Sequence, residues 1–443
     1  MTEQILLGIR DFLQPYVSLL NSHNVDYLTC NHWNTYVPEW IRQEDTVDLY
    51  DLFEKRYNEK SPAKNLLEEL IDQIVDWKRK IEQITYTREQ FEEQILPEKY
   101  ENELTSLKNK TRTFMSPKKE HEVEILAPII DQLANMVNVD SIIDYGSGRG
   151  YLGVKISYDY ERNVLGIESS EEILHSGEKR IETLSKYQKE LYDNIKYKTT
   201  STIVNSETNF EKLFSETFDS YSSSFLLCSL HACGSLSCSL LNHFVENLSV
   251  RAIANVACCY HLLEEKFVAN PFTNYCAEND PCSFPLSHRL IQEKTKLGRN
   301  ARMLAVQSFE RNKADQTLNA GLWYRALMQV LLVEIYGLTT GLQDIKLGKL
   351  TKNEVLIIVE DFISYNCITV NVINNYWIRY ESCRHQLHTF IQLKVLFSGL
   401  IEMMILLDRL VFLEESVPTA SSYLVALFDP IKSPRRWCLV SLK

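Results

Sequence analysis

The most regular feature of this sequence is an alternation of short apolar runs with longer stretches of helical spacing. Seven runs are rich in β-branched and other apolar residues and are bounded by polar or turn-forming positions, as strands are. These runs lie at residues 141–144, 164–168, 195–202, 224–230, 252–259, 422–429 and 436–442. Because helical patterns separate the first five runs, the alternation predicts strand–helix–strand units and a parallel sheet covered on both faces.

The rest of the chain is mostly helical in pattern and predicts parts added to this sheet. Residues 1–110 are predicted to form a helical N-terminal region, and residues 111–263 a core. The first helix of this core is expected to start at the N-cap residue Ser116, which precedes Pro117. Residues 264–390 are too long for one crossover helix, so they predict a mostly helical insertion. Residues 391–443 supply a last helix and two closing strands. The predicted fold class is α/β with a seven-stranded sheet.

Composition narrows the class of protein and its location. The chain has 443 residues with 45% hydrophobic and 24% charged content, which is ordinary for a globular protein. Its net charge of -12 argues against a protein that coats nucleic acid indiscriminately but leaves room for a local basic groove. Eleven cysteines without a secretory signal pattern predict reduced thiols and an intracellular location, cytoplasmic or nuclear and not secreted.

The most membrane-like window of the chain is Leu393 to Leu413. It contains Glu402, Asp408 and Arg409, each of which would cost roughly 2.5–3.5 kcal/mol at the centre of a bilayer. We therefore expect a long core helix at this position and no membrane partner.

The stretch "IIDYGSGRGYLG" follows the first predicted strand and contains two overlapping glycine patterns. D-x-G-x-G-x-G starts at Asp144, whereas G-x-G-x-x-G starts at Gly148 and ends at Gly153. Both patterns need a sharp turn and a helix whose free N–H groups face a ligand. The second pattern is typical of dinucleotide sites, but no other feature indicates a nicotinamide. We interpret it as incidental, with Gly153 inside the first helix.

Two acids favour the first glycine pattern. Asp144 ends the first strand, where a carboxylate suits the ammonium or sulfonium group of a cationic amino acid. Glu168 ends the second strand 24 residues later, where a carboxylate accepts both hydroxyls of a ribose. The predicted ligand is S-adenosyl-L-methionine; the alternative is that the glycines form only a tight turn. The predicted cofactor-binding residues are Asp144, Gly146, Ser147, Gly148, Gly150 and Glu168.

Five motifs occur in an order typical of one protein family. They are "FMSPKKEHEVEIL", "IIDYGSGRGYLG", "LCSLHACGSL", "VACCYHLL" and "ALFDPIKSPR". In these motifs the chain resembles the methyltransferase-like protein 25 family, which includes a relative named for a ribosomal RNA adenine dimethylase domain. The resemblance covers residues 114–443, with a weaker similarity before them, and implies a class I, Rossmann-like methyltransferase domain that uses S-adenosyl-L-methionine.

Two details of these motifs bear on which molecule would accept the methyl group. The "H-x-C-G" and "C-C-x-H" elements are also similar to those of eukaryotic transfer RNA 2′-O-methyltransferases. Enzymes that methylate an exocyclic adenine amine carry [DNS]-P-P-[YFW] after the fourth strand, whereas this chain has "LHACG" at Leu230 to Gly234. The sequence therefore departs from the dimethylase pattern.

Histidines and cysteines follow the fourth and fifth predicted strands, which are neighbours in the class I sheet order. One interpretation makes His231 or His261 a general base that removes a proton from a hydroxyl during methylation. The expected substrate-pocket residues are then Cys233, Gly234, Cys259 and Tyr260.

Two other interpretations of these residues stay open. A zinc site would take its ligands from His231, Cys233, Cys258 and His261. Alternatively, small buried cysteines suit crowded strand ends, and a histidine there is satisfied by a backbone carbonyl.

The expected acceptor is RNA, with protein as the alternative and a non-catalytic binding module as a third possibility. Lys118 and Lys119 precede the core, and a second basic stretch spans residues 288–302. These cations would line a groove for RNA phosphates or, alternatively, form a solvated helix face. The second stretch contains Arg289, Lys294, Lys296, Arg299 and Arg302.

Overall fold

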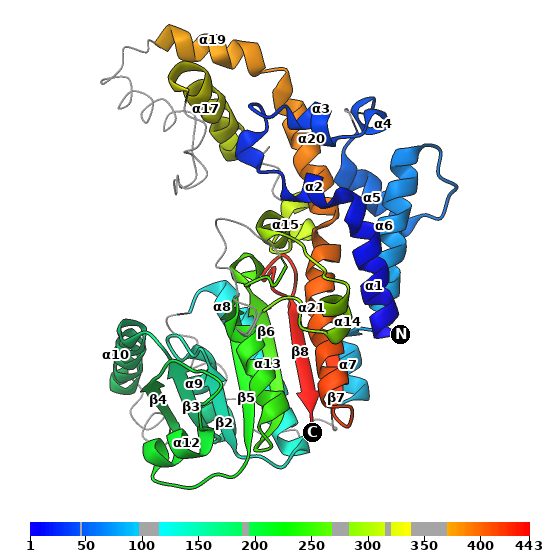
Figure 1. The fold of residues 1–443 in the computed structure, drawn as a ribbon. Coiled ribbons are helices and arrows are strands. Elements are labelled where there is room, and N and C mark those ends of the chain that lie inside the picture. The colour runs from blue at the N-terminus through cyan, green and yellow to red at the C-terminus, as the bar shows by residue number, and fades with distance from the viewer. Residues whose placement is uncertain (45–46, 97–114, 188–194, 268–282, 315–319, 338–369) are drawn as a thin grey trace. The chain divides into compact units, whose positions relative to one another are not determined.

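The computed structural model describes the chain except for residues 45–46, 97–114, 188–194, 268–282, 315–319 and 338–369 (Figure 1). The described residues fall into two compact units. The first, here called the sheet unit, comprises Met1–Arg10, Lys80–Gly298 and Glu402–Lys443. The second, called the helical unit, comprises Asp11–Arg79 and Arg299–Ile401. The divisions fall inside α1 (Thr2–Leu13), α6 (Leu66–Glu82) and α21 (Ser398–Ser416), and before α15 (Arg299–Leu304).

The described part of the sheet unit contains one mixed sheet of eight strands. They are β1 (Tyr86–Thr87), β2 (Ser141–Tyr145), β3 (Asn163–Glu168), β4 (Tyr197–Ser201), β5 (Phe225–Cys233), β6 (Val250–Cys258), β7 (Ser421–Ala426) and β8 (Trp437–Leu442). Their order is β1-β7-β8-β6-β5-β2-β3-β4. The strands from β2 to β6 pair in parallel, and β8 is antiparallel to both β6 and β7.

The predicted fold class is confirmed, with one correction to the strand count. Each of the seven predicted strands is present with small shifts at its ends, and the additional strand is β1, which pairs in parallel with β7. Because β1 is only two residues long, it produces no apolar periodicity that a sequence pattern could reveal. The sheet therefore has eight strands and not seven.

Helices cover both faces of this sheet. Among the described residues, the α-helices that lie wholly in the sheet unit are α7 (Arg88–Gln94), α8 (Pro117–Met136), α9 (Tyr151–Tyr160), α10 (Glu171–Tyr187), α12 (Phe210–Phe218), α13 (Leu236–Glu246) and α14 (His288–Gln292). Most of α1 and of α21 also belongs to this unit. Ile142, Leu226 and Ala254 pack with apolar residues of α8 and α9. The side chain of Asn255, the next residue of β6, faces α13 and donates to Ser237 over 2.7 Å. Because successive strand residues point to opposite faces, α8 and α13 lie on opposite sides of the sheet (Figure 1).

The strand order reverses at β2 and β5. After β2 the chain adds β3 and β4 on one side, and β5 and β6 follow on the other. In open α/β sheets ligands bind where the strand order reverses in this way. The start of α8 confirms the predicted cap, since the Ser116 side chain accepts from the Lys119 N–H over 3.3 Å and Pro117 is the first helical residue.

The helical unit joins residues that are far apart in the sequence. Its elements are η1 (Gln14–Tyr16), α2 (Val17–Asn21), η2 (Asn24–Asp26), α3 (His32–Tyr36), α4 (Glu39–Arg42), α5 (Leu49–Asn58), α16 (Phe309–Ala314), α17 (Ala320–Tyr336), α19 (Val370–Tyr380) and α20 (Cys383–Leu396), with most of α6 and all of α15. The buried ammonium group of Lys394 donates to the Ser22 carbonyl over 2.6 Å and to Asn24 Oδ1 over 3.0 Å. Burial lowers the pKa of Lys394 to about 7.

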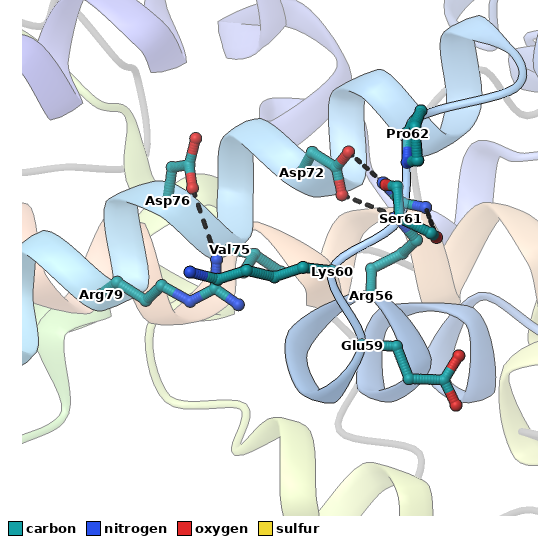
Figure 2. Close-up of a pocket in the computed structure, with 9 residues that line it drawn as sticks. All are labelled: Arg56, Glu59, Lys60, Ser61, Pro62, Asp72, Val75, Asp76 and Arg79. Carbon is teal, nitrogen blue, oxygen red and sulfur yellow. Dashed lines mark hydrogen bonds and ion pairs between the residues drawn. The ribbon is translucent and has the colours of Figure 1, made fainter.

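A pocket in the helical unit is lined by charged residues of α5, α6 and the segment between them (Figure 2). The Arg56 guanidinium donates through Nε to Asp72 Oδ1 over 2.7 Å and through Nη1 to Ser61 Oγ over 2.8 Å. Arg79 pairs with Asp76 one helical turn away. Because these charges compensate one another, we interpret the pocket as a structural ion-pair network.

The predicted domain boundaries differ from the boundaries of the two units. Residues 80–96 belong to the sheet unit and not to a separate N-terminal region, and residues 11–79 form one unit with 299–401. Part of the predicted insertion, residues 268–282, 315–319 and 338–369, lies outside the described residues. Apolar periodicity predicts that a helix has a buried face but does not tell which distant helix covers it.

The membrane-like window proves to be buried in protein. It falls within two consecutive helices, α20 and α21, which break at Phe397, so the predicted single long helix is corrected to two. The most apolar 18-residue window of Cys383–Ser416 is 89% buried. Asp408 accepts from the N–H groups of Leu286 and Ser287 over 2.8 and 2.9 Å, so this buried carboxylate is satisfied inside the sheet unit.

Candidate active site

The glycine loop between β2 and α9 adopts the backbone conformation that its sequence predicts. Gly146, Gly148 and Gly150 have φ values of +74°, +57° and +71°, a region that L-residues with side chains rarely adopt. The N–H groups of Gly146 and Ser147 donate to the Ile167 carbonyl over 2.9 and 3.0 Å, which ties the loop to the end of β3. A Cβ atom added at Gly148 would meet nothing within 4 Å, so space is open above this part of the loop.

The two predicted acids lie on either side of this loop. β2 and β3 are parallel, so Asp144 and Glu168 both lie at the carboxyl edge of the sheet. Asp144 is buried, and its Oδ2 accepts from the Gly153 N–H over 3.1 Å. Glu168 is half-buried, and its Oε2 accepts from the Gly148 N–H over 3.1 Å. The acid–glycine–acid set of the sequence is therefore one continuous site in space.

The charge state of Asp144 is sensitive to its surroundings. Burial raises the pKa of this carboxyl group to about 7, and the negative charge of Glu168 acts in the same direction. The Gly153 N–H and the positive charge of Lys119 oppose the rise in pKa. A cationic ligand beside Asp144 would supply the countercharge that a buried carboxylate needs in order to be ionised.

Tyr197 is a residue of this site that the sequence interpretation missed. Its ring, on β4, lies directly against Gly150, Gly153 and Gly166, at each of which a Cβ atom would come within 2.4–2.5 Å of it. Gly153 is inside α9, as predicted, but it is not incidental: it makes room for Tyr197 and donates to Asp144. No local pattern reveals this role, because β4 is brought against the loop only by the sheet.

His231 is bonded to a second missed residue, Glu122. The imidazole Nε2 lies 2.9 Å from both Glu122 carboxylate oxygens, and Ser433 Oγ donates to the same carboxylate over 2.6 Å. Glu122 is fully buried on α8, four residues before the core residue Leu126. An acid on the apolar stripe of a helix was the signal in the sequence that could have revealed it.

The backbone at His231 is strained in a way that directs its side chain. His231 has φ +74°, which is rare for a residue with a Cβ atom, and it lies at an irregularity in the pairing of β5 with β6 between Leu230 and Ala232. Such outliers persist where the surrounding structure holds them, and they cluster at functional sites. Here the bond to Glu122 and the neighbouring strand hold the histidine in place.

The His231–Glu122 pair is a neutral imidazole bonded to a carboxylate. Burial lowers the pKa of His231, and the nearby Lys118 and Lys119 also disfavour the charged ring. Burial by itself would raise the pKa of Glu122, but the bonds from His231 and Ser433 and the charge of Lys119 lower it to about 2. Nε2 therefore carries the hydrogen that Glu122 accepts, which leaves a lone pair on Nδ1.

Three cysteines at the ends of β5 and β6 have their sulfur atoms in contact. Cys233 Sγ lies 3.1 Å from Cys258 Sγ and 3.5 Å from Cys259 Sγ, and the last two sulfurs are 3.6 Å apart. The Cys258 thiol stabilises the Cys233 thiolate and lowers the pKa of Cys233 to about 6, whereas the pKa of Cys258 is raised. Among the described residues, the potential metal ligands gathered here are these three thiols.

This arrangement revises the expected pocket and zinc residues. Of the four expected zinc ligands, Cys233 and Cys258 come together, and the third member of their group is Cys259. His231 and His261 do not belong to this group. Tyr260 is not an open pocket residue: it is buried, and its hydroxyl donates to Glu402 of α21 over 3.1 Å. The sequence misled here because Tyr260 begins the turn η4 (Tyr260–Leu262), which directs its ring into the core.

Gly234 and His261 are the remaining candidate residues of the segments that follow β5 and β6. Gly234 has φ +55°, and its N–H donates to the Cys258 carbonyl over 3.3 Å. His261 is half-buried in η4 and does not belong to the group of clustered ligand atoms. Its expected role as a base stays a prediction.

The second basic stretch is less available for RNA than its sequence predicts. Arg302 is fully buried, so it cannot line a groove. Arg289 pairs with Glu293 on the next turn of the chain over 3.0 Å. The sequence pattern around α15 does not indicate that Arg302, one of its arginines, is buried.

Comparison with known proteins identifies the class to which this fold and site belong. A family model described as a methyltransferase domain matches residues 118–266, which include the glycine loop, both acids, His231 and the thiols. The chain thus contains a methyltransferase domain, with a Rossmann-like α/β fold.

The particular relatives confirm the resemblance found in the motifs. The chain is 26% identical over 99% of its length to probable methyltransferase-like protein 25 of Mus musculus, of which 96% is covered. It is 27% identical to the protein of the same name from Homo sapiens, with 77% of each chain covered. The chain is thus similar to methyltransferase-like protein 25 over most of its length.

Proposed function

We propose that this protein transfers a methyl group from S-adenosyl-L-methionine to RNA. The observation that carries the proposal is the pair of acids on either side of an open glycine loop, at the point where the strand order reverses. The methyltransferase domain supports the reaction class, and the charges around the site support the acceptor.

The residues around the loop fit the proposed cofactor. Asp144 would face the cationic amino-acid part, because a buried carboxylate with a single bond from Gly153 needs a countercharge. Glu168 would accept from the ribose hydroxyls, and Gly148 leaves the space above the loop free of side chains. When bound, the cofactor supplies a methyl group activated by a sulfonium centre. The loop orients that group toward the acceptor.

His231 is the proposed general base. Glu122 accepts the Nε2 hydrogen and fixes the ring, so the Nδ1 lone pair takes the proton from the acceptor hydroxyl. Burial lowers the pKa of His231 and favours the neutral imidazole, and Lys118 and Lys119, which contact the Glu122 carboxylate over 3.4 Å, act in the same direction.

A set of cations around His231 supports an RNA acceptor. We call Lys118, Lys119, Lys432 and Arg435 the basic rim. Lys118 and Lys119 interact electrostatically with His231, and Arg435 interacts with Cys259. Lys432 is exposed in the same segment as Ser433, which contacts Glu122. On a protein with net charge -12, a cationic edge at the acceptor side favours a polyanion such as RNA.

Calorimetry with S-adenosyl-L-methionine tests the cofactor site. We expect Asp144→Asn and Glu168→Gln to weaken binding about 10- to 100-fold, the range for losing a hydrogen bond to a charged group. Asp140→Asn is the control, because this aspartate is exposed at the opposite end of β2. Failure of the wild-type protein to bind at millimolar cofactor would overturn the proposal.

Labelling with a methyl-tritiated cofactor tests the acceptor. Cell RNA and protein fractions are incubated separately with the full chain, and we expect label in RNA that is lost in Lys432→Glu. Lys212→Glu is the control, since this lysine is exposed on α12. Label in protein alone would make the chain a protein methyltransferase. A protein that binds the cofactor and labels neither fraction would be a non-catalytic binding module.

A further inference from the structure

Cys233, Cys258 and Cys259, here called the thiol cluster, are brought together by two neighbouring strands. Cys233 ends β5 and is paired in register with Cys258, which ends β6. Cys259 follows with φ +53°, a left-handed conformation that turns the chain at the strand end. The sulfur–sulfur distances of 3.1, 3.5 and 3.6 Å place all three thiols around one point.

The spacing of the sulfurs suits a small ion that prefers thiolates. Zinc binds thiolates tetrahedrally at about 2.3 Å, which separates two bound sulfurs by about 3.8 Å. The Cys259 distances of 3.5 and 3.6 Å are close to this value, and the Cys233–Cys258 distance of 3.1 Å is shorter by about 0.7 Å, so the ion would enter after these two side chains separate by that amount. We propose that the thiol cluster binds one Zn²⁺ ion through three cysteine thiolates, with the fourth ligand supplied from outside the cluster.

The fourth position of this site is open. Among the described residues, no further histidine, cysteine or carboxylate places a ligand atom in the group. Cys258 is buried, Cys259 is half-buried and Cys233 is exposed, so the cluster opens toward the surface on the side of Cys233. Structural zinc sites have four protein ligands, whereas three ligands and an exchangeable fourth position are typical of sites that bind water or a substrate atom.

The surroundings of the cluster match a zinc ion with three thiolates. Such a centre has a net charge of -1, and the guanidinium of Arg435 is close enough to Cys259 to interact with it electrostatically. Glu168 interacts with Cys233, so the cluster lies on the same edge of the sheet as the glycine loop. The external ligand would be water or a nitrogen or sulfur atom of a molecule bound at this edge. The metal site requires no methyl donor and is independent of the proposed function.

Metal analysis of the purified full chain tests the proposal directly. The protein is prepared with a thiol-free reductant, dialysed against buffer without chelator, and measured by inductively coupled plasma mass spectrometry. We expect about one equivalent of zinc per chain and less than about half an equivalent in Cys233→Ser. Cys30→Ser is the matched control, because Cys30 is also an exposed free thiol but lies outside the cluster; it retains the zinc of the wild type.

Cobalt substitution keeps the proposal falsifiable if a variant fails to fold. We expect one equivalent of Co²⁺ to give thiolate-to-cobalt charge-transfer absorption and tetrahedral d–d bands in the wild-type protein. Cys233→His is expected to keep the tetrahedral bands with weaker charge transfer. The proposal is overturned by a wild-type chain with less than half an equivalent of zinc and no charge-transfer band. A metal-free chain whose Cys233 and Cys258 are linked as a disulfide in the peptide mass spectrum also overturns it.

Discussion

A few buried ionisable residues carry most of the chemistry of this protein. Asp144 and Glu122 are both fully or nearly fully buried carboxylates, yet burial affects them differently. Glu122 receives bonds from His231 and Ser433 and is held as a carboxylate, whereas Asp144 receives one backbone bond. A buried carboxylate with few hydrogen-bond donors, such as Asp144, is stabilised when a cation binds beside it. A buried carboxylate with several donors, such as Glu122, is already stabilised and fixes the orientation of the histidine bonded to it.

The raised pKa of Asp144 predicts that cofactor binding depends on pH. A group with a pKa of about 7 in the free protein is protonated as the pH falls from 7.5 to 5.5, and binding a cation then requires loss of that proton. We expect the affinity for S-adenosyl-L-methionine to fall in this range, approaching tenfold per pH unit. The measurement is calorimetry at several pH values.

Asp144→Asn and Glu168→Gln serve as the controls for this linkage. Asp144→Asn should bind weakly with a nearly flat pH dependence, and Glu168→Gln should bind weakly but keep the wild-type slope. An unchanged slope in Asp144→Asn would assign the linkage to another group. Without cofactor, Asp144→Asn should also unfold at a higher temperature than the wild type at pH 8. The pKa of Asp144 is raised in the folded state, so the wild-type fold loses stability as the pH rises toward 7, and the asparagine variant does not.

The His231–Glu122 pair predicts a characteristic pH–rate profile. Burial lowers the pKa of His231, so the base stays neutral at pH 7 and kcat/KM should fall only on the acidic side of the range in which an ordinary histidine titrates. His231→Ala is expected to lower kcat by about 100- to 10,000-fold, the usual contribution of a general base. Glu122→Gln should lower kcat less and shift the acidic limb to lower pH, because it removes the negative charge that favours the charged ring.

The control for this pair is the exposed His175, which lies 3.7 Å from Glu178 on α10. His175→Ala should leave the profile as it is in the wild type. If Glu122→Gln lowers kcat without moving the acidic limb, Glu122 acts on the fold and not on the base.

At the level of elements, the β4 strand packs against the glycine loop through Tyr197. Tyr197 fills the space left by glycines of the loop, of α9 and of β3, and its hydroxyl is buried among them. The small residues thus serve packing as well as backbone conformation. A loop supported in this way keeps its shape before any ligand binds, which is what positioning a reactive group requires.

This packing predicts the effect of adding a single methyl group. Gly166→Ala would bring a Cβ atom within 2.4 Å of the Tyr197 hydroxyl, and overpacking of this kind typically destabilises by about 1–3 kcal/mol. Tyr197→Phe removes the atom it meets, so the double variant should recover part of the loss. Gly399→Ala is the control, because this glycine lies in α21 with nothing within 4 Å. The measurement is thermal unfolding of the wild type, the two single variants, the double variant and the control. Additive losses of stability in the double variant would contradict the contact between Gly166 and Tyr197.

At the scale of the whole molecule, the chain builds each unit from distant segments. The sheet unit takes β1, α7 and the core residue Phe91 from the first hundred residues, and it ends with strands from the last twenty-five. The helical unit is made of residues from both sides of Lys80–Gly298, the longest segment of the sheet unit. Neither unit corresponds to one continuous stretch of sequence, so cutting the chain at one of the predicted domain boundaries would divide a unit.

Phe91 tests whether the N-terminal residues belong to the sheet unit. It is fully buried and packs with residues of α8, β7 and β8, so Phe91→Ala should cost about 3–5 kcal/mol. Leu66→Ala, on the exposed face of α6, should be near neutral. Calorimetric unfolding is expected to show a lower transition temperature for Phe91→Ala alone. A wild-type transition in that variant would show that the early residues do not contribute to this core.

The sequence by itself determined seven of the eight described strands, their order along the chain and the acid–glycine–acid set. These features depend on local conformation: β-branched runs predict strands, and a glycine-rich turn between a strand and a helix predicts a loop with free N–H groups. The tertiary structure alone decided that Glu122 orients His231, that Tyr197 supports the loop and that Cys259, not a histidine, joins Cys233 and Cys258. Each of these contacts joins residues from different elements, and local sequence fixes the conformation of an element but not its neighbours.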